Sequence, residues 1–129
     1  MSQKVVNVAV GIILRGEHSF ICKRPDDKHQ GGLWEFPGGK IEAGETTTQA
    51  LARELQEEIA IDVHSSSPFM VIEHDYGDKK VCLDIHTVSD FSGEPTGAEG
   101  QQGQWVAIAQ LAQYAFPEAN RAIIDKLCS

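Results

Sequence analysis

The chain has 129 residues, of which 41% are hydrophobic and 23% charged, and its formal net charge is −8. This length suits one domain with its own core, taken here as residues 1–129, and the composition is ordinary for a soluble globular protein. The net negative charge, with only eleven scattered Lys and Arg, argues against a protein that binds polymeric nucleic acid through its phosphates. No apolar run approaches the roughly 20 residues that cross a membrane, so no membrane partner is expected.

The cysteines and the N-terminus indicate a cytoplasmic protein. Cys22, Cys82 and Cys128 are an odd number without metal-ligand spacing, so we expect reduced thiols, with a Cys22–Cys82 disulfide as the alternative. No cleavable signal precedes the first strand-like segment. We expect a monomer whose partner is a small phosphorylated ligand, bound through bridging cations.

The first third of the chain has the pattern of strands separated by turns. Residues 5–14 are rich in Val and Ile, and residues 19–22 follow an Arg-Gly-Glu turn, which predicts a hairpin. Residues 25–32 are polar and turn-rich and are expected to form a loop. Residues 33–36 resume a strand pattern, which the Pro-Gly-Gly at 37–39 is expected to break.

A helix is predicted over residues 47–59. Thr46 followed by Gln49 matches a capping box, the pattern of a helix start. One face of this helix is apolar and carries Leu51, Ala52, Leu55 and Ile59. We expect that face to pack on the core.

A second hairpin is predicted beyond the helix. Residues 69–74 and 80–88 are the candidate strands, joined by a Tyr-Gly-Asp turn. Pro68 is expected to open the first of them, because a proline at a strand start costs no ladder hydrogen bond.

The last part of the chain is predicted to be a loop, a strand and a helix. Residues 91–103, rich in Gly and acidic residues, form the predicted loop, and residues 104–108 the strand. The Phe-Pro-Glu triplet at 116–118 is expected to open the final helix. The order of strands, helix, strands and helix predicts a mixed α/β sandwich.

The helix at 47–59 carries three carboxylates on one side. At about 100° per residue, Glu54, Glu57 and Glu58 fall within roughly a 100° arc. These like charges repel one another unless a positive charge lies among them, and Arg53 is placed to pair with Glu57. A solvated helix face is the plain alternative. Because hard cations prefer oxygen ligands, we favour a site for Mg²⁺, or for Mn²⁺ in its place, that serves phosphate chemistry.

The spacing of the glycines and acidic residues resembles the signature of the Nudix hydrolase family. Gly39 is followed after five residues by Glu45 and after seven more by Arg53-Glu54-Leu55-Gln56-Glu57-Glu58. The family normally has glycine where this chain has Ala60. The residue at this position often ends the helix in the left-handed conformation, and that conformation costs about 1 kcal/mol when the residue is alanine. The departure concerns the end of the helix, not metal binding.

The resemblance to the MutT-type branch of this family extends over nearly the whole chain. It includes residues 33–42, 93–95, 99–101 and 116–120. It implies an α/β fold, the Nudix-type α/β/α sandwich with a mixed β-sheet between helices. It also implies Mg²⁺-dependent hydrolysis of oxidised purine nucleoside triphosphates, notably 8-oxo-dGTP, to the monophosphate and pyrophosphate. Such an enzyme cleans the nucleotide pool used in DNA replication and DNA repair and so prevents mutation.

The resemblance implies roles for the acidic residues. The three helix glutamates would hold Mg²⁺ together with a backbone carbonyl from the turn at Gly38 and Gly39. Glu99, in the long loop, would be a further metal ligand or the general base, with an ordinary surface acid as the alternative. The choice of general base between Glu54 and Glu99 stays open.

Other charged residues are expected to support the site or to contact phosphate. Glu45 is expected to brace the loop rather than to bind metal, and Arg53 to orient a carboxylate. Arg24 and Lys40 are the candidate phosphate contacts.

Asn120 is the candidate for recognition of the base. Oxidation of guanine at C8 turns N7 into a donor beside the O6 acceptor, and an asparagine amide matches that pair. A turn or cap residue is the default alternative. Trp34 and Phe36 are candidates for stacking on the base, with the core as the alternative, above all for Phe36. Asp78 and Lys79 either line the base pocket or form a plain turn.

Two other functions are compatible with the residues and with the resemblance. One is the same chemistry on another nucleotide, such as a cytidine or methylated pyrimidine triphosphate. The other is a non-catalytic, nucleotide-binding regulatory module on the same fold. The second rival predicts degraded metal ligands, whereas all three helix glutamates are present.

Overall fold

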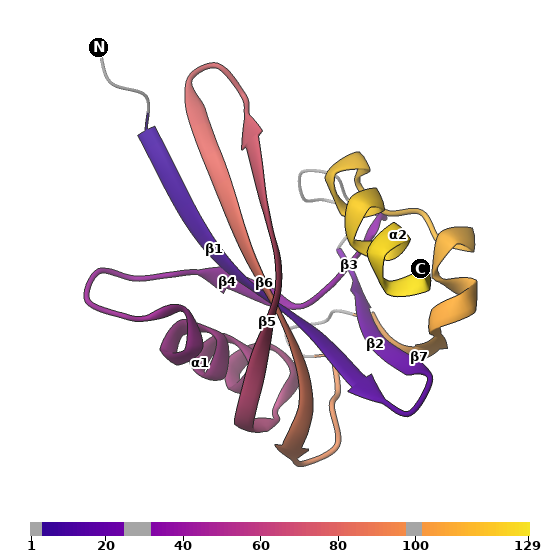
Figure 1. Cartoon of the computed structure of the whole chain (residues 1–129). Coiled ribbons are helices and arrows are strands. Elements are labelled where there is room, and N and C mark those ends of the chain that lie inside the picture. The colour runs from indigo at the N-terminus through magenta and orange to yellow at the C-terminus, as the bar shows by residue number, and fades with distance from the viewer. Residues whose placement is uncertain (1–3, 25–31, 98–101) are drawn as a thin grey trace.

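A mixed β-sheet with helices on both faces is the framework of the molecule (Figure 1). The structure is a computed structural model, which describes residues 4–24, 32–97 and 102–129. Its strands are β1 (Lys4–Arg15), β2 (His18–Lys23), β3 (Trp34–Glu35), β4 (Gly38–Lys40), β5 (Asp62–Asp75), β6 (Lys79–Ser92) and β7 (Gln102–Ala107). Its helices are α1 (Thr47–Ile59), α2 (Arg121–Cys128) and the 3₁₀ turns η1 (Ile108–Gln113) and η2 (Glu118–Asn120). The predicted fold class is confirmed.

Strand β1 organises the sheet. The main path of the sheet runs β3-β2-β1-β6-β5, with β4 added beside β1 and β7 beside β2. Strand β1 pairs in parallel with β6 along one edge. Along its other edge it pairs with β4 through Val8–Val10 and with β2 through Ile13–Arg15, both antiparallel. The short β4 is therefore held against the middle of the sheet.

Alternation along β1 divides the core into two layers. Ala9 and Ile13 are fully buried on the face that α1 covers, together with Leu51 and Leu55 of the helix. Val10 and Ile12 point to the other face, where α2 packs. This period-two pattern of a central strand places one apolar helix face on each side of the sheet.

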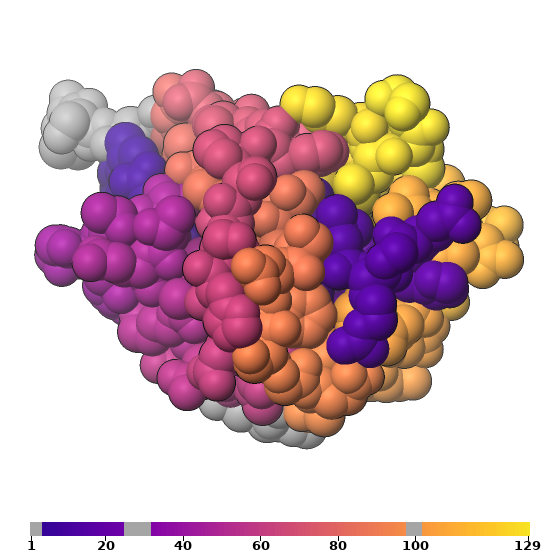
Figure 2. All heavy atoms as spheres, turned by 60° about the horizontal axis from the view of Figure 1, so that its bottom comes forward, coloured from indigo at the N-terminus to yellow at the C-terminus, as the bar shows by residue number. Residues whose placement is uncertain are grey.

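Helix α1 begins and ends as its sequence predicts. The Thr46 side chain accepts from the Gln49 N–H while the Gln49 side chain accepts from the Thr46 N–H, which completes the capping box. At the other end Ala60 has φ 62° and ψ 35°, the left-handed conformation, and its N–H bonds to the Gln56 carbonyl. Turned to bring its lower side forward, the molecule shows α1 and β5 side by side at the surface (Figure 2).

The β5–β6 hairpin is much longer than predicted. Both strands have 14 residues, and the prediction that Pro68 opens a strand is wrong, because Pro68 lies inside β5. Strand β5 is at the edge of the sheet, and its pairing with β6 shifts register near this proline, between Pro68 and Met70. An edge strand with such irregularities tolerates a residue that lacks an N–H.

Strand β3 ends at Glu35, before the Pro-Gly-Gly at 37–39, as predicted, but the two glycines themselves belong to a new strand. Gly38 and Gly39 open β4, where they pair with Val10 and Ala9 of β1. A Cβ at Gly38 would collide with the Ala9 carbonyl oxygen, so the missing side chain permits this close pairing. The glycines are thus part of the sheet.

The C-terminal third differs in detail from the prediction. The predicted loop at 91–103 is shorter, because β6 extends to Ser92 and β7 already begins at Gln102. The final helix opens with the 3₁₀ turn η2 before α2 begins at Arg121, and η1 was not predicted. In the stretches that the structure describes, none of the helices has the length and apolarity to cross a membrane. All three cysteines are unpaired thiols.

Replacing Ala60 by glycine should stabilise the protein. Among the described residues, Ala60 is the one non-glycine residue with positive φ, and its Cβ is unfavourable in that conformation. We expect Ala60→Gly to raise the free energy of unfolding by about 1 kcal/mol, measured by urea denaturation. Ala43→Gly is the control, since Ala43 has no such conformation to relieve and gains nothing. A loss of stability in Ala60→Gly would contradict the account.

Candidate active site

Helix α1 places its acidic face against the glycines of β4. The carboxyl group of Glu54 lies directly over Gly39, where a Cβ would collide with it. The Gly38 N–H donates to Glu58 Oε2 at 3.2 Å. Glu57 is the most exposed of the three predicted metal ligands, with 61% of its side chain accessible against 20% for Glu54. Glu54 and Glu58 are therefore neighbours of the two glycines, while Glu57 lies beside them on the exposed side of the helix near Arg53.

The guanidinium of Arg53 is the positive charge among these carboxylates. It bonds twice to Glu45, at 2.8 Å from Nε and 2.9 Å from Nη2, and once to Glu54, at 2.8 Å from Nη1. Nη1 also lies 3.7 Å from Glu57 Oε2, and Nη2 donates to the Lys40 carbonyl at 3.1 Å. The expected contact with Glu57 is thus the longest of these, and Glu45 is the residue to which Arg53 donates two hydrogen bonds.

Glu45 is a fixed support for Arg53. Hydrogen bonds from Arg53, and then from the Glu42 N–H, lower the pKa of the Glu45 carboxyl to about 2. The hydrogen bond with Glu45, and then that with Glu54, raise the pKa of Arg53 above its already high value. Both groups stay charged at neutral pH, so their bidentate pair orients the guanidinium toward Glu54.

A buried thiol lies beneath the acidic face. Cys22 is fully buried in the layer under α1. Burial, and then the charges of Glu58 and Glu35, raise the pKa of its thiol to about 12. Sequence reasoning assigned Cys22 no place near the site. The pairing of Cys22 with Glu35 across β2 and β3, which brings both there, depends on strand register.

The donor set suits a hard divalent cation, although the carboxylates are engaged with protein groups. Glu54 and Glu57 face Arg53, and Glu58 faces the Gly38 N–H. Within residues 4–24, 32–97 and 102–129, no three acidic, histidine or cysteine side chains form a ready-made cage. A cation bound by oxygens must therefore draw Glu54 and Glu57 from Arg53. Glu99 lies outside the described residues.

The candidate phosphate contacts lie on neighbouring strands. Arg24 follows β2 directly, and its Nη1 donates to Glu35 Oε1 at 2.8 Å, a part-buried pair that orients the guanidinium. Lys40 closes β4 with an exposed side chain. Glu35 was missed by sequence reasoning, because only the β2–β3 pairing shows what its carboxylate contacts.

The candidates for base recognition lie on the α2 side of the sheet. Phe36 is buried and stacks on Phe116, with ring centroids 5.2 Å apart, so it belongs to the core. Trp34 is half-buried and meets Tyr114 edge to face. Asn120 ends η2 at a half-buried position, and in the described structure its side chain makes no capping hydrogen bond with α2.

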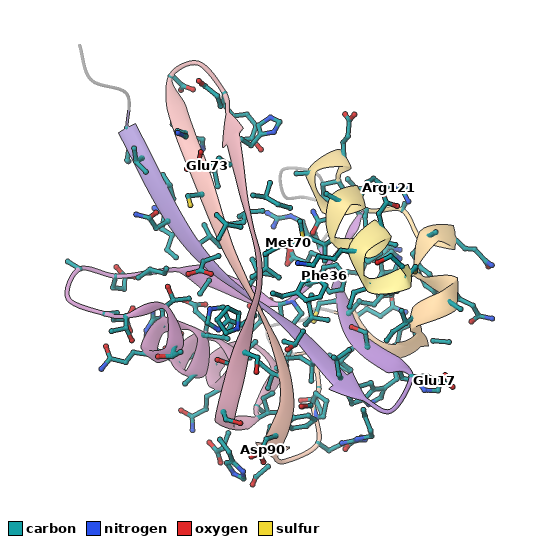
Figure 3. All side chains as sticks on the ribbon, viewed as in Figure 1. Glu17, Phe36, Met70, Glu73, Asp90 and Arg121 are labelled. Atoms are coloured by element: carbon teal, nitrogen blue, oxygen red, sulfur yellow. The ribbon has the colours of Figure 1, made fainter. Side chains whose placement is uncertain are left out.

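Half-buried apolar side chains of the sheet share this face. Val8, Leu83 and Ile72 lie in one row across β1, β6 and β5, and Met70 lies in the next row beside buried Ile85. Figure 3 shows Met70 and Phe36 close together between the sheet and α2. These side chains give a flat ring an apolar surface to lie on.

Asp78 and Lys79 lie in the turn at the tip of the β5–β6 hairpin (Figure 1). Lys79 closes that turn, since its carbonyl accepts from the Tyr76 N–H at 2.8 Å, and its Nζ lies 5.8 Å from the Tyr76 ring. A plain turn explains both residues.

Comparison with known proteins gives the family. The model of the NUDIX domain matches residues 9–126, and the chain belongs to this family, as its sequence pattern predicts. It is 44% identical over 126 residues to the 8-oxo-dGTP diphosphatase of Escherichia coli K12, covering 96% of this chain and 97% of the relative. It is also 31% identical to the CTP pyrophosphohydrolase of Escherichia coli K12, over 95% of this chain and 90% of the relative.

A solved structure agrees with this placement. It is described as MutT from Aliivibrio salmonicida and Vibrio cholerae and superposes with a TM-score of 0.88 at 47% identity, covering 96% of this chain and 97% of that one. The resemblance to the MutT-type branch is confirmed.

Replacing Gly39 by alanine should displace the Glu54 carboxylate. The added Cβ would occupy the place where that carboxyl group lies. If the acidic face binds a divalent cation, we expect Gly39→Ala to weaken Mn²⁺ binding by about tenfold or more, measured by titration followed by electron paramagnetic resonance. Gly16→Ala is the control: its φ of 57° costs alanine about 1 kcal/mol of stability, but Gly16 has open space around it and lies in the β1–β2 turn, so the acidic face is left unchanged. Unchanged binding in Gly39→Ala would show that Glu54 needs no close approach to β4.

Proposed function

We propose that this protein is a Mg²⁺-dependent nucleoside triphosphate pyrophosphohydrolase that cleaves 8-oxo-dGTP to the monophosphate and pyrophosphate. The observation that carries the proposal is the seating of Glu54 over Gly39, with Arg53 and Glu45 beside it. It is supported by family membership and by relatives named 8-oxo-dGTP diphosphatase.

The acidic face of α1 holds the cation in this proposal. Glu54, Glu57 and Glu58 supply the carboxylates, with a backbone carbonyl from Gly38 or Gly39, and Mn²⁺ is able to replace Mg²⁺. When bound, the cation would neutralise phosphate charge and lower the pKa of the attacking water, so that a carboxylate can remove its proton. Arg53 gives up its bonds to the ligands but keeps Glu45, so it remains in place.

Proton removal and phosphate binding fall to other side chains. A carboxylate, Glu54 or Glu99, takes the proton from the attacking water. Arg24, oriented by Glu35, and Lys40 bind the phosphate oxygens. Water adds to phosphorus as the phosphoanhydride bond breaks, which releases pyrophosphate and the nucleoside monophosphate.

The apolar surface beside α2 takes the base in the same proposal. Met70 and the row formed by Val8, Leu83 and Ile72 lie under the ring, and Trp34 closes one side. Asn120, half-buried nearby, accepts from N7–H and donates to O6 of an oxidised guanine. The proposal further includes a monomer at work in the cytoplasm, which suits three unpaired thiols.

A second candidate is the same chemistry on a pyrimidine nucleotide. The similarity to a CTP pyrophosphohydrolase favours it, although at lower identity than the similarity to 8-oxo-dGTP diphosphatases. A non-catalytic module fits less well, because all three carboxylates are kept and two of them, Glu54 and Glu58, face the glycines of β4.

A panel of nucleoside triphosphates with Mg²⁺ tests the proposal. We expect 8-oxo-dGTP to be hydrolysed fastest and Asn120→Ala to lose at least about tenfold of the preference for 8-oxo-dGTP over dGTP, measured as the ratio of kcat/KM values. Asn120→Asp is the matched variant, since it keeps the shape but loses the donor to O6. Fastest release of pyrophosphate from CTP would favour the second candidate. An unchanged preference in Asn120→Ala would remove Asn120 from base recognition.

A further inference from the structure

A string of polar side chains crosses the apolar layer under α1. Thr47 Oγ1 donates to Asp84 Oδ2 at 2.8 Å, and Asp84 Oδ1 lies 3.4 Å from His86 Nε2. The other nitrogen of His86, Nδ1, shares a hydrogen bond of 3.0 Å with Ser66 Oγ. The string therefore joins the first residue of α1 to β6 and β5.

The string is buried at His86 and partly exposed at its other members. Only 7% of the His86 side chain and 34% of the Asp84 side chain are accessible. Polar groups in such a place cost free energy unless each is paired, and a fully paired network fixes one arrangement of the elements that it joins. An apolar pair would pack equally well. The directional hydrogen bonds that these polar residues make therefore explain their presence better than a gain in stability does.

Asp84 lies in the same row of the sheet as Gly39. Ala9 of β1 pairs with Gly39 on one side and with Asp84 on the other, so one row runs across β4, β1 and β6. Glu54 rests on the Gly39 end of this row and Thr47 on the Asp84 end. Helix α1 thus touches one row at two points, on either side of β1.

The spacing of the two points matches the helix. Thr47 and Glu54 are seven residues apart, so they lie on nearly the same side of α1, about 10.5 Å apart along its axis. Two strand spacings measure about 9.6 Å. On the same side of the helix Leu51 and Leu55 pack on Gly11, where a Cβ would lie 3.2 Å and 3.0 Å from their Cδ1 atoms. Apolar packing of this kind turns one face of the helix to the sheet, but it has no direction and fixes the rotation less closely than a hydrogen bond does.

We propose that the Thr47–Asp84–His86–Ser66 string is a positioning device that sets the rotation of α1 on the sheet. The hydrogen bond of Thr47 is the second fixed point, beside Glu54 over Gly39. It keeps the acidic face turned toward β4. Asp84 acts through Thr47, and His86 and Ser66 hold Asp84. This inference rests on the proposed function, because its consequence is the approach of the carboxylates to a divalent cation.

Thr47→Val and Thr47→Ser test the inference as a matched pair. Valine keeps the shape of threonine without the hydroxyl, whereas serine keeps the hydroxyl. We expect Thr47→Val to weaken Mn²⁺ binding to the nucleotide-free protein by about tenfold and Thr47→Ser to stay within about twofold of wild type. The KM for Mg²⁺ in hydrolysis should rise in parallel, with kcat at saturating Mg²⁺ preserved. Urea denaturation of all three proteins gives their stability independently.

Each outcome decides between positioning and simple stabilisation. Equal Mn²⁺ affinity in wild type and Thr47→Val, with lower stability of the variant, overturns the inference and leaves the proposed function intact. Wild type that neither takes up Mn²⁺ nor hydrolyses any nucleotide overturns the proposed function itself. If Thr47→Val does not fold, Asp84→Ala provides the same comparison. Failure of both variants to fold also overturns the inference, since the string would then hold the fold and not the rotation of the helix.

Discussion

The guanidinium of Arg53 is the group on which the acidic side of α1 depends. Glu54 and Glu57 would repel each other on a bare helix face, and Arg53 lies within 2.8 Å of the first and 3.7 Å of the second. Glu45 accepts hydrogen bonds from the other two nitrogens of the guanidinium, Nε and Nη2, in a bidentate pair. The ion pairs are partly exposed, so each contributes little to stability. In the proposed function their role is geometric, because they hold the carboxylates beside a positive charge that a cation would replace.

The arrangement of the carboxylates depends secondly on the glycines of β4. A helix can present carboxylates to a sheet only where the sheet offers room, and Gly39 supplies that room under Glu54. Gly38 adds an N–H for Glu58. Because β4 pairs with the middle of β1, the strand that bears the glycines cannot shift without breaking the centre of the sheet. Site and core are therefore built from the same strand pairs.

Local signals in the sequence predicted much of the fold. The capping box at Thr46, the left-handed Ala60 and the strand rich in Val and Ile at residues 5–14 depend on neighbouring residues, and the structure has all of them. The length of β5 was not predictable in this way. Its first half, from Asp62 to Ser67, is polar and largely exposed because it lies at the edge of the sheet, so it lacks the apolar pattern of a strand.

Contacts between distant segments were beyond local reasoning. The predicted glutamates and glycines do lie together, but the bond of Thr47 to Asp84 joins residues 37 positions apart and follows only from the register of β1 with β4 and β6. The place of Cys22 beneath the acidic face depends in the same way on the pairing of β2 with β3. The spacing of residues in the sequence thus predicts which groups lie close together, but the pairing of the strands determines which residues support them.

The central claim is that the carboxylates of α1 exchange Arg53 for a divalent cation. Calorimetric titration of Mg²⁺ into wild type and Glu57→Gln, each with a non-hydrolysable nucleoside triphosphate analogue present, measures this most directly. The account predicts heat of binding for wild type and affinity lower by about tenfold or more in Glu57→Gln. Wild-type protein that takes up no Mg²⁺, or a variant that binds it as tightly as wild type, would contradict it.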